Sequence, residues 1–507
     1  MAINQLKAGA ALSYLIIIFN ILIGVLYTPL LLRELGQAEY GLYSLAASVI
    51  AYLTLLDLGF GNAIVRYTAK YRAEGREQEQ WELFGMFVRL YCAVGVVALG
   101  IGLALVFNTE SLFGATMDGV ELGRMRTILI LMSLNLAFTF PLSIFGSIIT
   151  AYENFVFQRV VSLVRIILNP LVMIILLLVG YKAIALVVVT TIFNLATLLI
   201  NWWYCRRKLH IKISYGKMRW RPLREIFAYS FWIFLNAIMD KIYWSSGQFI
   251  LGVYKGAATV AVYAVAIQLQ QLYMMFSTAI SGVFLPRVTA MVSNNEGTKA
   301  ISDLFTRTGR MQFSVMAFIL TGFILLGRPF ITLWAGEPYA LAYPITLLLF
   351  VPLTVPLIQN MGITILQAQN RMRFRSIVYL IIALLSLVAS IIVAPKYGAM
   401  GCAVATASAL FAGQVVVMNI YYQRCVGIDI VGFWREIGKM SIVPISVLFA
   451  GYHVIKQFEI VTIASLITAA ALFCIVYIPL FWLLSLNSYE RGVITTSLGK
   501  IKSRFAR

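Results

Sequence analysis

The sequence predicts an all-α membrane protein with about fourteen transmembrane helices, arranged as two six-helix lobes followed by two further helices. The first observation behind this prediction is composition, since 61% of the 507 residues are hydrophobic and 12% are charged. The second is the placement of charge: the 40 Lys and Arg residues, which outnumber Asp and Glu by 20, lie almost entirely between long apolar runs. A helix needs roughly 20 apolar residues to cross the hydrocarbon core, so no soluble domain of ordinary size fits beside these spans.

Each predicted span is an apolar run that ends at charged or polar residues. The first six lie near residues 8–32, 41–65, 84–107, 125–150, 161–180 and 183–204. After a polar stretch, six more lie near 226–253, 260–285, 311–334, 342–366, 377–394 and 400–423, and the last two lie near 438–456 and 460–485. The polar stretch indicates a domain boundary. It divides the chain into an N-lobe (1–205), a basic linker (206–225), a C-lobe (226–424) and two extra spans with a tail (425–507).

The distribution of basic residues predicts the orientation of the chain. Loops on the N-terminal side hold 30 of the 40 Lys and Arg residues, the opposite loops hold 8, and Arg89 and Lys241 lie inside spans. Because basic loops stay in the cytoplasm, both termini are predicted to be cytoplasmic. The first apolar run is followed by no small-residue cleavage site, so we expect it to be a retained span. We expect the basic linker to touch anionic membrane lipid rather than a specific ligand.

Two internal matches indicate that a six-span unit is duplicated. Residues 36–46 match 256–266 at four of eleven positions, and 149–157 align with 366–374. The two offsets, 220 and 217 residues, agree closely. Because six is even, the copies share one orientation and are related by a pseudo-two-fold axis along the membrane normal. Such a pair can rock around a central cavity, which is the geometry of alternating access.

Asp240 and Lys241 lie near the middle of the span 226–253, too far from its ends for their charges to reach water. They begin a broad polar surface on that helix. The same surface carries Asn236, Tyr243 and Trp244. A charge pair at this depth marks a substrate or ion pathway, or else a structural tie in which a neighbouring helix neutralises one of the charges. Of these two, we expect the pathway.

Three other ionisable residues at membrane depth leave two interpretations each. Arg89 and Arg165 lie about one to two turns inside the cytoplasmic ends of their spans, where a long side chain either anchors to the headgroups or lines a cavity. Asp57 opens the segment Asp57-Leu-Gly-Phe-Gly, in which two glycines loosen the second span. It either carries a proton or pairs with Arg66 or Lys241, or it bonds to freed backbone as a packing element.

Neutral polar residues recur within spans of both halves. They include Asn20, Asn135, Gln268, Gln271, Gln359 and Asn360. Any one of them is more often an interhelical hydrogen bond than a ligand, yet together they fit a hydrated centre. Of these, Gln268, Gln271, Gln359 and Asn360 are candidate substrate-binding residues.

The sequence carries no sign of enzyme machinery. Its two histidines, His210 and His453, cannot build a metal site or a catalytic triad, and its five cysteines lack metal-like or disulfide-like spacing. A Walker-type glycine loop is also missing. We therefore expect no catalysis, no metal, no cofactor and no nucleic-acid partner. Energy would come from a proton or sodium gradient, from the substrate's own gradient or from its downstream consumption.

Two segments near the start carry a family resemblance. Residues 31–44 read Leu-Leu-Arg-Glu-Leu-Gly-Gln-Ala-Glu-Tyr-Gly-Leu-Tyr-Ser, and 56–71 read Leu-Asp-Leu-Gly-Phe-Gly-Asn-Ala-Ile-Val-Arg-Tyr-Thr-Ala-Lys-Tyr. These segments resemble the opening of bacterial oligosaccharide flippases of the polysaccharide transporter family. That family belongs to the multidrug/oligosaccharidyl-lipid/polysaccharide exporter superfamily. The layout is similar over nearly the whole chain, while the most recognisable sequence covers about the first seventy residues.

The resemblance implies a function in the bacterial cytoplasmic (inner) membrane. The cargo would be an undecaprenyl-pyrophosphate-linked sugar or oligosaccharide, moved from the cytoplasmic to the outer leaflet for surface polysaccharide synthesis. Lys241, with Arg89 and Arg165, would bind the pyrophosphate. Polar and aromatic side chains would contact the sugar, and Asp240 or Asp57 would couple transport to an ion.

The resemblance also bears on partners and on competing functions. The chain would act as a monomer among membrane lipids, beside polysaccharide polymerase or assembly proteins. A drug exporter of the same superfamily, a lipid II flippase, and a membrane polymerase or ligase of lipid-linked sugars are the alternatives. The short, histidine-free outer loops disfavour the enzyme, and the basic or mixed charge at membrane depth disfavours a drug exporter.

Overall fold

The computed structural model describes residues 5–216, 220–281, 297–369, 371–457 and 460–492, together with Val288, Met291 and Thr495. Part of the basic linker (217–219), the end of the eighth predicted span (282–285) and the tail beyond 495 lie outside the described residues. The elements within these ranges are helices joined by turns, without strands. Each of the fourteen predicted spans overlaps one or more of these helices.

Eleven stretches of the described chain are long and apolar enough to cross a membrane. Two of them, Ala11–Ala73 and Met372–Val426, hold 63 and 55 residues, which is enough for two crossings each. The prediction of an all-α protein with many membrane spans is therefore confirmed. The chain folds as two compact units, Met1–Ala264 with Leu387–Cys402, and Val265–Ser386 with Ala403–Arg507.

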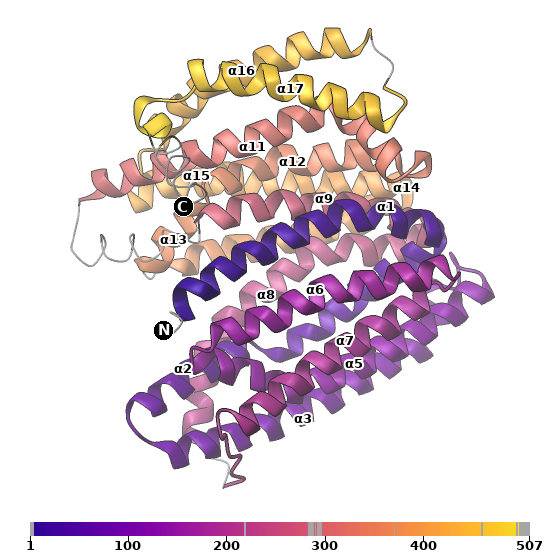
Figure 1. The fold of residues 1–507 in the computed structure, drawn as a ribbon, viewed down its shortest axis with the longest axis vertical. Coiled ribbons are helices and arrows are strands. Elements are labelled where there is room, and N and C mark those ends of the chain that lie inside the picture. Colours follow the sequence, from indigo (N-terminus) through magenta and orange to yellow (C-terminus); the bar gives the residue numbers. More distant parts are fainter. Residues whose placement is uncertain are drawn as a thin grey trace, which may run out of the picture. The chain divides into compact units, whose positions relative to one another are not determined.

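The first unit is built mainly from the N-terminal helices. They are α1 (Gln5–Leu53), η1 (Thr54–Asp57), α2 (Phe60–Ala73), α3 (Glu77–Phe107), α4 (Thr109–Phe113), α5 (Gly119–Ala151), α6 (Phe155–Leu178), α7 (Ala183–Arg207) and α8 (Trp220–Lys255). The α5 helix packs against α3 and α7, and α6 packs along α1 (Figure 1). These contacts place α5 at the centre of the unit.

The second predicted span is broken where its sequence holds Asp57-Leu-Gly. The α1 helix first bends at Gly36, whose φ of 75° suits a residue without a Cβ. A short 3₁₀ turn, η1, then ends at Leu58 (φ 51°) and Gly59 (φ 75°), which both adopt left-handed backbone. The α2 helix starts afresh at Phe60. The break exposes backbone groups of the span to side-chain partners inside the unit.

An aromatic core lies beside this break. Phe60 and Phe87 are fully buried with ring centroids 5.9 Å apart, and Tyr91 stacks on Phe140 at 6.2 Å. The start of the basic linker packs against the same core through alternate apolar residues, Leu209, Ile211 and Ile213. This part of the linker is therefore docked on the protein.

The second unit is organised around α11 (Thr298–Trp334). The helix packs against α12, α16 and α17. The other elements are the later part of α9 (Ala257–Ser281), η2 (Glu337–Tyr339), α12 (Ala342–Ile358), α13 (Asn360–Ala368), parts of α14 (Met372–Leu410), η3 (Phe411–Val417), α15 (Met418–Tyr421), η4 (Tyr422–Val426), α16 (Ile430–Ile455) and α17 (Ile463–Leu484).

A buried ion cluster ties the chain's last described residues to α11. Arg310 donates from Nε and Nη2 to the two carboxylate oxygens of Glu490, at 2.6 and 3.0 Å. It also donates to Glu436 at 2.8 Å and to the carbonyl oxygen of Ser485 at 3.1 Å. The side chains of Arg310 and Glu490 are only 7% and 4% exposed. The extra C-terminal spans are therefore anchored to α11 by charge as well as by packing.

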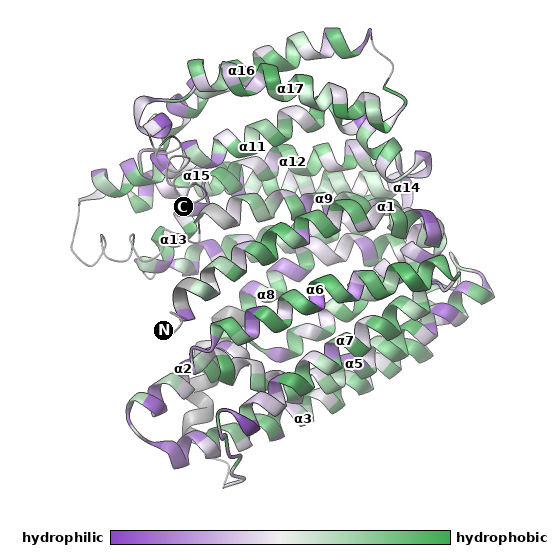
Figure 2. Ribbon diagram, viewed as in Figure 1, coloured by the Kyte–Doolittle hydropathy of each residue, from purple (hydrophilic) through white to green (hydrophobic). Residues whose placement is uncertain are grey.

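The outer faces of the helices carry large apolar side chains. Leu26, Phe107 and Phe449 are 72%, 82% and 72% exposed. Figure 2 shows hydrophobic residues along the bodies of the helices and hydrophilic ones gathered at helix ends and connections. An exposed apolar surface of this kind is favourable in contact with lipid and unfavourable in contact with water. The exposed faces therefore support a multi-pass membrane protein.

Candidate functional site: a cationic cavity in the first unit

A cavity of about 380 Å³ lies among five helices and the 3₁₀ turn of the first unit. Its walls come from α1, η1, α5, α6, α7 and α8. They are Tyr43, Ala47, Ile50, Ala51, Thr54, Met132, Asn135, Leu136, Thr139, Arg165, Val187, Thr190, Thr191, Asn194 and Lys241. Two of the three cations predicted to meet the substrate, Arg165 and Lys241, thus line one cavity although they are 76 residues apart in the sequence.

A chain of hydrogen bonds holds Arg165 at the cavity wall. Its Nη1 donates to Oδ1 of Asn194 at 3.1 Å. The amide nitrogen of Asn194 donates in turn to Oδ1 of Asn135 and to Oγ1 of Thr139, each at 2.8 Å. Asn135 and Thr139 are four residues apart on α5, so both face α7. The network fixes the guanidinium through neutral partners and leaves its charge available.

Lys241 reaches the cavity from α8. Its side chain is half-buried and forms no ion pair with any side chain that the structure describes. A hydroxyl contact between Tyr52 on α1 and Ser246 on α8 holds the two helices together about one turn away from it. The lysine amine is therefore positioned by its helix and is not neutralised by a described neighbour.

Among the described residues that line the cavity there are two cations and no Asp or Glu. An ammonium or guanidinium group held away from bulk water attracts a counter-ion strongly, because screening is weak there. Phosphate oxygens bind such cations and also accept hydrogen bonds from amide and hydroxyl donors. The amide nitrogen of Asn135 and the hydroxyl of Thr191 supply donors of this kind, whereas Asn194 and Thr190 already donate to partners within the protein. The cavity can therefore bind an anion with a polar, hydroxylated group attached.

Arg89, the third predicted cation, lies elsewhere in the first unit. Its Nη2 donates to the carbonyl oxygen of Gly216 at 2.6 Å, and its guanidinium lies 5.7 Å from the ring centre of Tyr215. The linker also donates from Ser214 N–H to the carbonyl oxygen of Trp81 at 3.1 Å. Arg89 thus holds the docked linker against α3 and does not line the cavity.

Asp57 lies at the break between η1 and α2. Its Oδ1 accepts a hydrogen bond from the Tyr91 hydroxyl at 2.6 Å, and the backbone N–H groups of Gly59 and Gly61 also donate to its carboxylate. These contacts favour the packing alternative, in which the carboxylate satisfies backbone freed by the two glycines. Asp57 is not among the residues that line the cavity.

The remaining candidates on α8 surround Lys241 along the helix. Asp240 is exposed, Asn236 is half-buried, and Tyr243 is buried with its ring centre 5.7 Å from that of Trp244. None of these four lines the cavity described above. They remain predicted site residues on a helix that contributes one residue to the cavity.

The four predicted amides of the C-lobe belong to the second unit. Gln359 is 2% exposed and exchanges hydrogen bonds with Asn419 at 2.8 and 3.3 Å, and Asn419 also accepts from the Trp434 indole at 2.8 Å. This is the interhelical bonding that a buried amide usually serves. Gln271 is exposed, while Gln268 and Asn360 are half-buried.

Sequence reasoning missed several residues of the cavity wall, above all Asn194, Thr139 and Tyr43. The sixth predicted span (183–204) has two amides, Asn194 and Asn201, and Asn194 is the one near its middle, which is a usable signal. The relation of Thr139 to Asn135, four residues earlier, was another. Neither signal predicts the contact by itself, because the contact also requires that α5 and α7 are neighbours.

The described residues contain no group of three or more His, Cys, Asp or Glu side chains that could hold a metal ion.

A family model described as polysaccharide biosynthesis protein matches residues 6–292. A Shigella flexneri protein named “Putative O-antigen transporter” is 20% identical over 406 residues, which cover 78% of this chain and 92% of that protein.

Solved structures share the fold at low sequence identity. A structure titled as lipid II flippase MurJ in an inward closed conformation has a TM-score of 0.69 and 17% identity, and it covers 93% of this chain and 99% of its own. An inward-facing multidrug resistance transporter of the MATE family, in the MOP superfamily, has a TM-score of 0.65 and 13% identity, covering 82% and 95% of the two chains. The fold is thus that of MOP-superfamily transporters. With the family match across more than half of its length, the chain belongs to the polysaccharide biosynthesis protein family.

Proposed function

We propose that the protein is a flippase that moves an undecaprenyl-pyrophosphate-linked sugar or oligosaccharide to the outer leaflet for surface polysaccharide synthesis. The observation that carries the proposal is the cavity whose described wall holds Arg165 and Lys241 and no carboxylate. The pyrophosphate would bind between the two cations, and the first sugar would contact the amides and hydroxyls of the wall. The polyprenyl tail would stay in lipid. The cavity would open first to one side of the membrane and then to the other.

The proposed setting is the bacterial inner membrane, with both termini in the cytoplasm. The excess of basic residues in loops on the N-terminal side supports this orientation. The protein would work as a monomer that receives its cargo from cytoplasmic glycosyl transfer and passes it to polysaccharide polymerase or assembly proteins.

Charge reversal in the cavity tests the function. Lys241→Glu and Arg165→Glu each place a carboxylate where the pyrophosphate would lie, and we expect both to abolish export of the surface polysaccharide. Arg207→Glu is the matched control, because Arg207 is exposed at the end of α7 and outside the cavity. Lipid-linked oligosaccharide should accumulate on the inner face with the two cavity variants and not with the control. Undiminished export by stably inserted cavity variants would overturn the proposal.

The same experiment separates the competing functions. A lipid II flippase would accumulate the peptidoglycan precursor instead of a polysaccharide precursor. A drug exporter would change drug susceptibility without accumulation of either lipid. A polymerase or ligase would leave the lipid-linked sugar accessible at the outer face while polymer length falls.

We assign coupling to a proton or sodium gradient to Asp240 in preference to Asp57. Asp240 directly precedes Lys241, a residue of the cavity wall, whereas Asp57 is not among the residues that line the cavity and its carboxylate accepts a hydrogen bond from Tyr91. In proteoliposomes, an imposed gradient should accelerate flipping by the wild type and by Asp57→Asn, but not by Asp240→Asn. An Asp240→Asn variant that responds to the gradient like the wild type would remove this assignment.

A further inference from the structure

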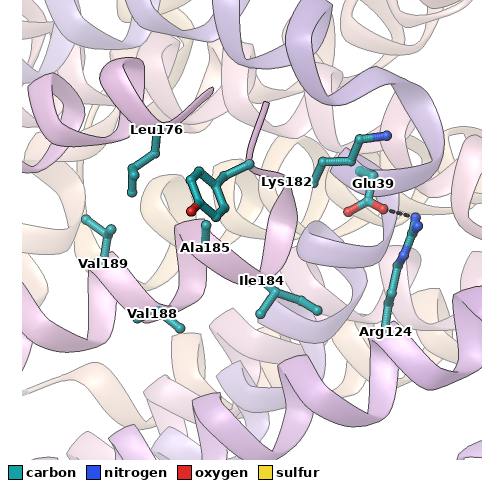
Figure 3. Close-up of a pocket in the computed structure, with 9 residues that line it drawn as sticks. Glu39, Arg124, Leu176, Lys182, Ile184, Ala185, Val188 and Val189 are labelled. Carbon is teal, nitrogen blue, oxygen red and sulfur yellow. Dashed lines mark hydrogen bonds and ion pairs between the residues drawn. The ribbon is translucent and has the colours of Figure 1, made fainter. Parts of the chain in front are cut away.

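A second cavity of about 520 Å³ lies at another place in the first unit, where α6 gives way to α7 (Figure 3). Three of its lining residues are charged and the others are apolar or aromatic. They are Glu39, Arg124, Leu176, Tyr181, Lys182, Ile184, Ala185, Val188 and Val189. Its volume lies within the range of small-molecule sites, about 300–1,000 Å³.

The charged and apolar residues separate along the cavity. Figure 3 shows Glu39, Arg124 and Lys182 gathered at one side, with Leu176, Val188 and Val189 at the opposite side. Along α7, Val189 is seven residues beyond Lys182, which corresponds to about 10 Å of helix. The cavity is therefore a polar end joined to an aliphatic trough.

The position of the cavity is at a membrane interface. Its polar end lies at the connection between two candidate spans, Phe155–Leu178 and Ala183–Arg207. The flanking residues Leu178 and Val179 are 67% and 69% exposed, as expected for side chains that face lipid. An occupant with a polar head at this connection would extend its apolar part into the hydrocarbon.

Each carboxylate oxygen of Glu39 has a partner within the protein. Its Oε1 pairs with Arg124, and its Oε2 accepts a hydrogen bond from the backbone N–H of Ala183 at 3.2 Å. Its side chain is 4% exposed. Glu39 therefore cancels the charge of Arg124, and its burial leaves little of its carboxylate accessible to a further cation.

The positive charge of Lys182 is not paired with a negative charge in the described part of the chain. The residue is exposed, it lines the cavity, and it forms no ion pair with a residue in the described part of the chain. The polar end thus carries one uncompensated positive charge. This matches a single phosphodiester, whereas the pyrophosphate of a lipid-linked sugar carries more negative charge than the site balances.

We propose that this cavity is a binding site for an anionic phospholipid of the phosphatidylglycerol type. The phosphate binds Lys182, and one acyl chain lies along Leu176, Val188 and Val189. A zwitterionic phospholipid binds less well, because little of the Glu39 carboxylate is accessible to its ammonium group. The lipid would cover the place where Glu39 of α1 contacts Arg124 of α5 and the first residue of α7.

Native mass spectrometry of the full-length protein tests the site. The protein is equilibrated with equal amounts of phosphatidylglycerol and phosphatidylethanolamine, and the retained lipid is identified. We expect the wild type to retain one phosphatidylglycerol. Lys182→Gln should weaken retention about fivefold, the value of one basic residue at a lipid surface. Val188→Trp, which fills the trough, should weaken it at least as much.

Lys456→Gln is the matched control, because Lys456 is an exposed lysine at the end of α16 and far from the cavity in sequence. It should retain the lipid like the wild type. Equal retention of both lipids, or retention by Lys182→Gln and Val188→Trp at the wild-type level, would overturn the proposal. Displacement of the retained lipid by an equimolar polyprenyl pyrophosphate would also overturn it, in favour of a cargo site. None of these outcomes depends on whether the cationic cavity transports oligosaccharide.

Discussion

An Asn194→Asp substitution would test the cationic cavity with almost no change in shape. The amide oxygen of Asn194 lies 3.1 Å from Nη1 of Arg165, so the new carboxylate would form an ion pair with the guanidinium. The second carboxylate oxygen would replace the amide nitrogen that donates to Asn135 and Thr139, so Asn135 would have to turn its own amide nitrogen toward it. Thermal unfolding of the variant, compared with that of the wild type, separates a loss of binding from a loss of stability.

The cost to an anionic ligand follows from the same distance. A phosphate bound on the far side of the guanidinium would lie about 6 Å from the new carboxylate, and at an effective dielectric constant of about 20 the repulsion is about 2.8 kcal/mol. Since 1.4 kcal/mol corresponds to tenfold in affinity, the dissociation constant should rise about 100-fold. Asn194→Leu adds no charge and should cost much less.

The assay is binding of a short-chain polyprenyl pyrophosphate to detergent-solubilised protein, measured by a change in intrinsic tryptophan fluorescence at low and high salt. The affinity of the wild type should fall with added salt, and that of Asn194→Asp should be weak throughout. An Asn194→Asp variant that binds within twofold of the wild type would refute the view that the uncompensated charge of Arg165 binds the ligand.

Two other contacts give predictions of stability and of linker docking. Arg310→Ala leaves the carboxylate of Glu490 buried without its main partner, so the free energy of unfolding in a denaturing-detergent titration should fall by about 3–5 kcal/mol. The double variant with Glu490→Ala should recover part of that loss, and equal losses in both variants would contradict the role of the buried charge. Arg89→Ala removes the bond to Gly216, so proteolytic cleavage within 209–216 should rise about fivefold, from a contact worth about 1 kcal/mol at this exposed position. Arg207→Ala is the control for this measurement, and unchanged cleavage in Arg89→Ala would show that apolar packing alone docks the linker.

The helical architecture could be predicted from the sequence, because the membrane imposes its structural requirement on each apolar segment separately. A run of apolar residues long enough to cross lipid must be helical, and its charged ends are visible in the chain. A loosened span near Asp57 was predicted from Gly59 and Gly61, and the structure has Leu58 and Gly59 there in left-handed backbone. The lobe boundaries around the linker at 206–225 stay a prediction.

The site followed from the sequence only in part. Arg165 and Lys241 were named because charge at membrane depth is rare, and they do line one cavity. Arg89 was named on the same ground, yet it binds linker backbone that lies 127 residues later in the chain. A contact between residues so far apart cannot be predicted from the pattern of neighbouring residues in the sequence. The pairing of Asn194 with Asn135 was invisible for the same reason, because it depends on which helices become neighbours.

The part of the cationic cavity's wall that the structure describes carries no acidic side chain, which has a consequence for chemical probes. Compact dianions such as bisphosphonates should block the site, while cationic amphiphiles should be repelled from it. A dianion does not cross a bilayer, so it can inhibit only from the compartment toward which the cavity is open. Added separately to the inside and the outside of sealed vesicles, such an inhibitor would reveal which face of the membrane the resting transporter presents.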